Sequence, residues 1–168
     1  MSQFPVIPPG RRVTSGLLMS MLPLQVIKQS QTLRASTTTL TADPELVLPL
    51  EASAQYIIDG HIIYGAASAT PGLQCSIVGP AGSSGVWSAN APAVSAVPDP
   101  ALMRWRSFGL SSSTGFGSNG SNNAGMRIHA NITTTTAGNL SFNWAQSVSN
   151  ATATEVQAGA WIRAFRAS

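Results

Sequence analysis

Apolar and polar residues alternate with a period of two along several stretches of this chain, the pattern of β-strands buried on one face. Near the C-terminus, Leu140, Phe142 and Trp144 fall on one face of an extended segment. After a Ser/Asn/Thr-rich passage, residues 160–166 alternate again and carry two large aromatic side chains. Because a loose terminus does not retain such side chains, we expect both segments to be central strands of a β-sandwich.

Similar patterns predict further strands at residues 24–29, 45–52, 56–64, 73–78, 103–110 and 126–132. Pro49 indicates an edge strand or a bulge. The pair Asp59 and Gly60 favours a tight hairpin on local rules, but its arms would be very short, so we expect one bent strand. These segments give about eight to ten short strands, typical of an all-β sandwich or jelly roll.

Two stretches rich in Gly, Ser, Ala and Asn interrupt the strand pattern, residues 79–100 and residues 111–125. We expect long surface connections there, with at most one short strand in the first. Trp87 and Phe116 are the large aromatic side chains of these stretches, and they are the candidates for exposed recognition, for example of a glycan. We expect the other tryptophans to lie in the core or at an interface between subunits, which are the commoner positions for this residue in a strand.

The N-terminal residues 1–23 read as an arm in front of a β-domain at residues 24–168. The first ten residues are broken by prolines and should be extended. Thr14 or Ser15 can cap a short helix that ends before Pro23. A helix this short docks on something, either its own domain or a neighbouring protein. The candidate docking residues are Phe4, Val6, Ile7, Arg11, Arg12, Leu17, Leu18 and Met21.

The chain is sparingly charged for its size. Of its 168 residues, 43% are hydrophobic and only 9% are charged, against about 25% in typical proteins. Such a surface suggests that partners cover much of it. The net charge is +3, and four of the nine basic residues lie in residues 1–34 without any acidic residue. This is too little basic surface for a nucleic-acid binder.

No motif indicates a catalyst, a cofactor or a metal. Cys75 is the only cysteine, so we expect a buried apolar side chain there and no internal disulfide. A Ser-His-Asp triad could be assembled on paper from Asp59 and His61, but no nucleophile elbow accompanies them. A metal site would need His61, His129 and Cys75 to converge from three strands. Because no catalytic motif is present, we expect a non-enzymatic protein. The sequence shows no signal peptide and no apolar run of membrane-spanning length, so we expect a protein made in a cytoplasm.

Three pieces of the sequence carry a resemblance that spans nearly the whole chain. They are GRRVTSGLLMSMLP at the start, STTTL followed by DPEL, and FNWAQ followed by AGAWIR at the end. In these the chain resembles a family of small structural proteins of tailed phages that infect actinobacteria. The resemblance implies a TNF/C1q-like jelly roll that forms homotrimers on the virion, as head decoration or as a tail-associated appendage. It transfers no catalytic residue.

Two functions follow as expectations. The leading one is a trimeric capsid decoration protein, assembled in the host cytoplasm, whose arm grips the phage major capsid protein. The outward face of the last strand, with Trp161, Arg163 and Phe165, would then meet a neighbouring subunit. The alternative is a tail-associated module, bound to tail proteins, that recognises host surface glycan through Trp87 and Phe116.

Overall fold

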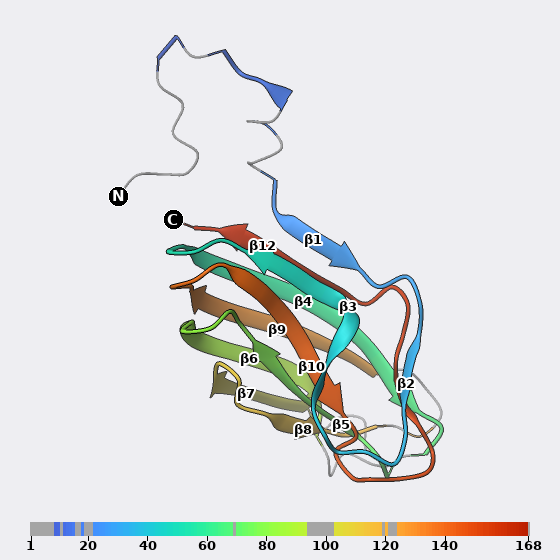
Figure 1. The fold of residues 1–168 in the computed structure, drawn as a ribbon. Helices are drawn as coiled ribbons and strands as arrows, with labels where there is room; N and C mark the ends of the chain where they lie inside the picture. The colour runs from blue at the N-terminus through green and yellow to red at the C-terminus, as the bar shows by residue number, and fades with distance from the viewer. Residues whose placement is uncertain are drawn as a thin grey trace.

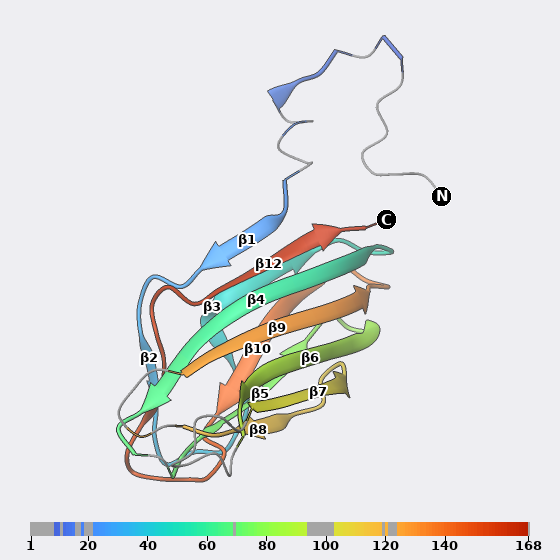
Figure 2. The ribbon, with the colours of Figure 1, turned by 180° about the vertical axis from the view of Figure 1, so that it is seen from behind.

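The computed structural model describes residues 9–10, 12–15, 18, 22–68, 70–93, 103–118, 120 and 124–167. Within them the chain forms twelve strands in two antiparallel sheets that lie face to face (Figures 1 and 2). The large sheet contains β1 (Leu24–Ile27), β2 (Thr32–Arg34), β4 (Gln55–Ala66), β6 (Ser84–Pro92), β7 (Met103–Gly109), β9 (Ala124–Thr133), β11 (Thr154–Val156) and β12 (Trp161–Arg166). The small sheet contains β3 (Thr41–Leu50), β5 (Leu73–Val78), β8 (Thr114–Phe116) and β10 (Gly138–Ala145). The predicted β-sandwich is therefore confirmed.

The order of the strands is that of a jelly roll. The large sheet runs β1-β12-β4-β9-β6-β7, with β11 and β2 attached beside β4, and the small sheet runs β3-β10-β5-β8. When β2, β6, β7 and β11 are left out, eight strands remain. Renumbered from one to eight along the chain, they follow the order 1-8-3-6 in the large sheet and 2-7-4-5 in the small sheet. Two facing sheets of this order make an eight-stranded jelly roll. The paired strands β6 and β7 widen the large sheet beyond this core.

The inner faces of both sheets form one hydrophobic core, because alternate residues of each strand point inward. The largest fully buried side chains are Trp87, Trp144, Tyr56, Tyr64, Lys28, Phe116, Phe142, Leu46, Ile58, Ile62, Leu73 and Ile77. The predicted core positions Leu140, Phe142 and Trp144 are confirmed, and both closing segments are interior strands of their sheets. β10 lies between β3 and β5, and β12 lies between β1 and β4.

Two local predictions about strands are also confirmed. Residues 55–66 form one strand, and Gly60 lies in its middle, where an added Cβ would come within 3.1 Å of Ile162 Cγ2. The neighbouring strand β12 therefore leaves little room for a side chain there. Pro49 lies in β3, which is the edge strand of the small sheet within the described residues.

The expectation for residues 79–100 and 111–125 was wrong. The first stretch contains β6, a nine-residue strand between β9 and β7, and the second contains β8. Small side chains made β6 look like a loop, yet they allow it to approach its neighbour closely. At Gly85, with φ of 152°, an added Cβ would lie 2.1 Å from the carbonyl oxygen of Asn131. Glycine is thus needed where β6 meets β9.

A buried ion pair fastens the start of the domain to both sheets. Lys28, which directly follows β1, places its Nζ 2.8 Å from Asp43 Oδ1 in β3, and both side chains are fully buried. The same carboxylate accepts hydrogen bonds from Trp144 Nε1 at 3.0 Å and from the backbone N–H of Glu45 at 3.0 Å. Lys28 also donates to Thr32 Oγ1 at 2.7 Å. The pair therefore ties β1 and β2 to the small sheet.

Arg34, the last residue of β2, also contacts the small sheet. Its guanidinium lies 4.2 Å from the centroid of the Trp144 ring, and it donates hydrogen bonds to the carbonyl oxygens of Thr41 and Ala42, each at 2.9 Å. Burial lowers the pKa of Arg34 from its ordinary value, while the negative charge of Asp43 acts in the opposite direction. Stacking and hydrogen bonding together hold Arg34 over the edge of the core.

Replacing Asp43 with asparagine should destabilise the fold strongly. The change keeps the shape but removes the buried counter-charge of Lys28, and only the partly exposed Glu45 carboxylate, 3.5 Å from Lys28 Nζ, then remains. We expect a loss of about 3 kcal/mol of unfolding free energy. Urea unfolding at a fixed protein concentration measures it. Glu51→Gln is the control, because it breaks the exposed ion pair with Arg166 and should cost about 0–1 kcal/mol. Equal losses in the two variants would contradict this role of Asp43.

Acid should loosen the loop between β1 and β2. The Glu45 carboxylate accepts hydrogen bonds from the Ser30 hydroxyl and from the backbone N–H of Gln29, and these lower its pKa from 4.5 to about 2. The pKa is lower in the folded state, so this stabilisation is complete above pH 4.5 and is lost as the pH falls toward 2. Unfolding midpoints across this range should show the loss in the wild type and a smaller loss in Glu45→Gln. An identical pH dependence in both would exclude Glu45 as the source.

Candidate functional site: the outward face of the large sheet

The outward face of the large sheet, here called the outer face, carries most of the chemistry that the fold leaves accessible. Strand register arranges its side chains in rows that cross the strands. One row contains Gln25, Arg163, Asp59, His129, Ser88 and Ser107. The next row contains Ile27, Trp161, His61, Arg127, Asn90 and Trp105. On the other side lies a row of Phe165, Ile57, Asn131 and Val86.

Charged groups in the first row form a network around Asp59. Its Oδ1 lies 2.6 Å from His129 Nδ1, and its Oδ2 lies 3.2 Å from Arg163 Nη2. Arg163 in turn lies over two aromatic rings of its own strand, 5.2 Å from the centroid of Trp161 and 5.0 Å from that of Phe165. The network therefore orders the outer face of β12, including the three residues expected at a subunit interface.

Apolar side chains are also exposed on this face. Ile57 is 47% exposed, Val86 is 55% exposed and Phe165 is 37% exposed. Single exposed apolar residues are ordinary on protein surfaces. Here Phe165 and Ile57 are direct cross-strand neighbours, and only Asn131 separates Ile57 from Val86. Such contiguous apolar surface is typical of a site that contacts another protein.

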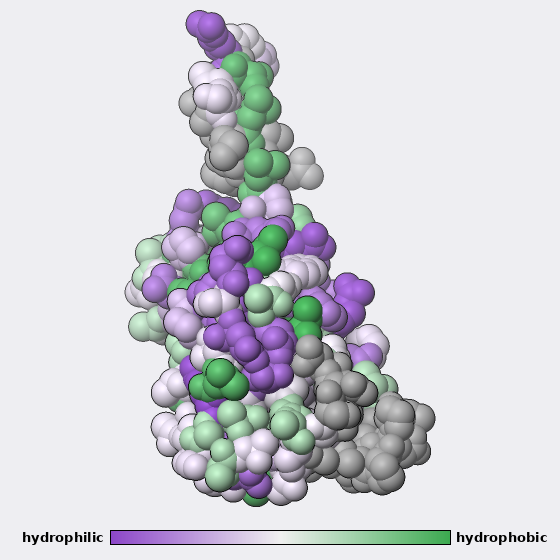
Figure 3. Space-filling view, turned by 90° about the vertical axis from the view of Figure 1, so that its right-hand side faces the viewer, coloured by the Kyte–Doolittle hydropathy of each residue, from purple (hydrophilic) through white to green (hydrophobic). Residues whose placement is uncertain are grey.

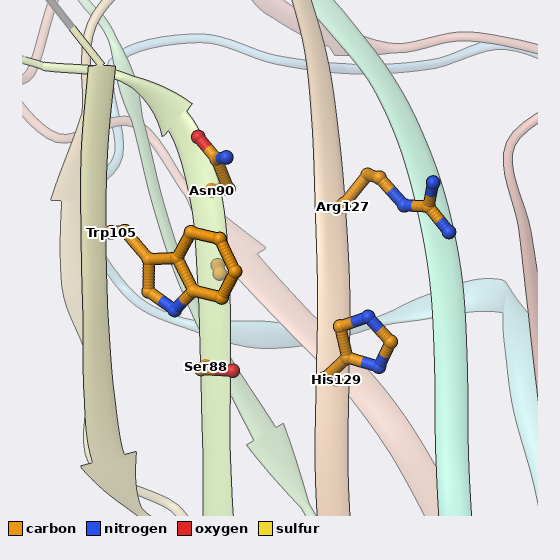
Figure 4. A pocket seen from close by; sticks show the side chains of 6 residues that line it. Ser88, Asn90, Trp105, Arg127 and His129 are labelled. Atoms are coloured by element: carbon orange, nitrogen blue, oxygen red, sulfur yellow. The ribbon is translucent and has the colours of Figure 1, made fainter.

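A hollow opens at the far end of the outer face. It has a volume of about 320 Å³ and is lined by Ser88, Ala89, Asn90, Trp105, Arg127 and His129. Figure 4 shows the Trp105 indole lying over β6 between Ser88 and Asn90. Arg127 and His129 stand on β9, and their side chains point away from Trp105, toward β4. A second hollow of about 260 Å³ adjoins it and shares Ser88 and His129. A ligand could thus contact an aromatic surface and several polar groups together.

The aromatic residues expected to be exposed are buried. Trp87 is 1% exposed and Phe116 is 0% exposed. The Trp87 ring contacts Phe108, with 5.0 Å between ring centroids, and its Nε1 donates a hydrogen bond to the carbonyl oxygen of Ser112 at 3.2 Å. Their recognition role is therefore corrected, because β6 and β8 point both rings into the core.

Trp105, expected in the core or in a seam, is instead the most exposed aromatic residue of the outer face among the described residues. It is 72% exposed on β7, the edge strand of the large sheet in the described residues. Charged neighbours on both sides, Arg104 and Arg106, are the sequence signal that could have indicated a strand with no fully buried face. The neighbours of Trp105 depend on the register between strands, which this local pattern does not indicate.

The structure describes only part of the predicted docking arm. Phe4, Val6, Ile7, Arg11, Leu17 and Met21 lie outside the described residues. Arg12 and Leu18 are described and exposed, and the backbone N–H of Leu18 donates to the carbonyl oxygen of Thr14 at 3.0 Å, as in one helical turn. In Figure 3 the described part of this segment stands off the body, and its apolar residues include the exposed Val13 and Leu22.

The groups considered for metal binding do not converge. Cys75 lies buried in the small sheet, whereas His61 and His129 lie on the outer face of the large sheet. In the described part of the chain, no three His, Cys, Asp or Glu residues are grouped so that they could hold a metal. Burial raises the pKa of the Cys75 thiol far above its ordinary value, so the predicted apolar role of this cysteine is confirmed.

One row does contain the residue types of a hydrolase triad, although with His129 in place of His61. Asp59 contacts His129, and Ser88 is the cross-strand neighbour of His129. Among the described residues, however, no hydrogen bond joins Ser88 to His129. The strand β6 is also paired on both sides, so its backbone N–H groups are used in the sheet rather than as an oxyanion hole. An ion-pair network describes the row better.

Comparisons with known proteins add little. No protein-family model matches this chain, and no curated protein matches it. Among solved structures, a chain from the structure of infectious bursal disease virus, Gx strain, is similar with a TM-score of 0.21 and 7% sequence identity. That match covers 99% of this chain and 41% of the viral chain. At so low a TM-score, neither fold nor function is inferred from it.

Within the described ranges, no helix has the length and apolar character needed to cross a bilayer. Among the described residues, the outer face and the exposed N-terminal segment both offer contacts to a partner.

Proposed function

We propose that this chain is a non-enzymatic structural protein of a phage virion, a homotrimeric jelly roll that decorates the capsid and is anchored to the major capsid lattice by its N-terminal arm. The observation that carries the proposal is the outer face, where the aromatic and aliphatic side chains of the rows stay exposed although the core is complete. Such a face supports association with other protein subunits. The protein assembles in the host cytoplasm and resides on the particle surface.

The composition of the surface supports self-association. With 9% charged residues, an isolated chain would have little electrostatic repulsion to keep it apart from its own copies. The row of Phe165, Ile57 and Val86 supplies apolar contact area, and the ordered Arg163 can pair across a subunit boundary. The number of three subunits follows from the family resemblance, and the surface supports association in general.

The N-terminal segment suits an anchor for a mechanical reason. It leaves the domain at β1, and the residue directly after β1 is Lys28, which is held in the buried ion pair with Asp43. The main chain of Lys28 is fixed as well, since its N–H donates to the carbonyl oxygen of Ala160 at 2.8 Å. A load on the arm is thus transmitted directly to the core. The exposed Val13, Leu18 and Leu22 offer the apolar contacts that a partner would cover.

A tail-associated module that recognises host glycan is the second candidate. The observation in its favour is the hollow beside Trp105, which combines an exposed aromatic surface with polar groups. Trp87 and Phe116 take no part, because both are buried. The two candidates share the fold and the arm, and they differ in what the arm binds: head lattice in one, tail proteins in the other.

A charge placed in the centre of the apolar row should break the subunit contact. Ile57→Glu would bury an unpaired carboxylate at the interface, which costs several kcal/mol and should raise the dissociation constant roughly a hundredfold. Sedimentation velocity over a range of protein concentrations measures this. Val148→Glu, a change at another exposed valine, is the control and should leave the association unchanged. Unaltered association of Ile57→Glu would exclude this row from the interface.

Removal of residues 1–23 should separate assembly from anchoring. The truncated chain keeps both sheets and the outer face, so it should fold and self-associate as the full chain does. It should fail to bind purified phage heads that lack the protein, as measured by co-sedimentation. Conversely, residues 1–23 fused to an unrelated trimeric carrier should bind the same heads. Binding of the truncated chain to heads would show that another part of the protein makes the contact. Binding of the full chain to tails and not to heads would favour the tail-associated module.

A further inference from the structure

The hollow beside Trp105 has an aromatic wall that the fold itself does not use. Trp105 projects from the edge strand β7 and lies across β6 between Ser88 and Asn90 (Figure 4). An exposed indole is unusual on a soluble surface, because it leaves a large apolar ring in water. Its flat face can pack against the C–H groups on one side of a sugar ring. The shallow, open site suits such a ring better than it suits a long aliphatic chain.

The opposite wall of the hollow carries the cationic side chain of Arg127. Arg127 and His129 extend from β9, and Arg127 has no ion-pair partner among the described residues. Its cross-strand neighbours, His61 and Asn90, carry no negative charge. The carboxylate of the neighbouring row, Asp59, is already shared between His129 and Arg163. Arg127 can therefore turn over the hollow and bind a carboxylate with its planar guanidinium.

Asn90, a residue of the lining, has a side-chain oxygen that lacks a partner among the described residues. Asn90 Oδ1 is buried, and within the described part of the chain no hydrogen bond reaches it. A buried acceptor without a donor costs about 1–3 kcal/mol, and a ligand hydroxyl would recover that cost. The Ser88 hydroxyl lies in the same lining and can donate or accept. With a volume of about 320 Å³, the hollow is near the lower end of ligand sites, which suits one or two sugar units.

We propose that this hollow binds an anionic sugar, a pyranose unit that bears a carboxylate and belongs to an acidic polysaccharide. Trp105 stacks on the ring, Arg127 binds the carboxylate, and Asn90 with Ser88 binds ring hydroxyls. The hollow lies between β9 and the edge strand β7, away from Phe165 on β12, whereas Ile57 and Val86 line the hollow that adjoins it. Sugar binding there goes beyond the structural role. The chain's own arm is a poor occupant, because Arg11 and Arg12 would face Arg127 with like charge.

Calorimetric titration of the full chain tests the proposal with three probes: tetragalacturonate, maltotetraose and inorganic phosphate. We expect binding of tetragalacturonate, weaker binding of the neutral maltotetraose, and weakening of the former as salt is added. Trp105→Ala and Arg127→Gln should each reduce the affinity for tetragalacturonate about tenfold or more. Leu33→Ala, at an exposed residue of β2, and Arg106→Gln are controls outside the hollow and should leave the affinity for tetragalacturonate unchanged. Each variant is first compared with the wild type in thermal unfolding.

Several results would overturn the proposal. Absence of heat with tetragalacturonate, or equal binding of maltotetraose, would remove the anionic sugar as the ligand. Phosphate binding as tight as that of the oligosaccharide would indicate a simple anion site. Unchanged binding in the Trp105→Ala variant would place the sugar elsewhere. If the wild type binds no sugar and the Trp105→Ala variant sediments with a different mass, the hollow is a contact between protein subunits. None of these outcomes bears on Ile57→Glu, which tests the subunit contact separately.

Discussion

The buried ion pair of Lys28 and Asp43 is the contact on which the arrangement of this domain depends. Lys28 belongs to the end of the large sheet, Asp43 belongs to β3 of the small sheet, and Trp144 of β10 donates to the same carboxylate. A charge buried without its partner is very costly, so the pair locks the two sheets in one relative position. It also fixes where β1 runs, and thereby where the N-terminal segment leaves the body.

The outer face is a consequence of the same constraint. Once β1 is placed beside β12, register carries two rows of outward side chains across the sheet from β1 to β7, and a third row from β12 to β6. Asp59, His129 and Arg163 come from three different strands and meet because each occupies the same row. Alternation within a strand is enough to bury one face. The pairing between strands then decides which exposed side chains become neighbours, and this determines what the face can bind.

Strong alternation in single strands made much of the fold predictable. The strands around Ile58, Ile128 and Phe142 were predicted, and Phe142 was placed on the correct buried face. A single strand through Gly60 was also predicted correctly. β6 was missed, because its residues include Gly85 and small alanines that look like loop composition. With β6 unrecognised, Trp87 was wrongly treated as exposed, although its ring completes the core beside Phe108.

The site was less predictable than the fold for a physical reason. Lys28 and Asp43 are separated by a strand and two turns, and nothing local to either residue indicates that they meet in the core. The hollow at Trp105 likewise depends on the register between β6, β7 and β9, which single-strand patterns do not define. Residues 1–23 differ again, since their prolines, arginines and short apolar run indicate an interaction segment by composition alone.

The central claim is that this jelly roll works as an assembled subunit, with its outer face against other copies of the chain. The molar mass of the purified full-length protein in solution, determined by sedimentation equilibrium at micromolar concentration, tests this most directly. The account predicts three times the 17.4 kDa of one chain. A mass of 17.4 kDa at every concentration would contradict it.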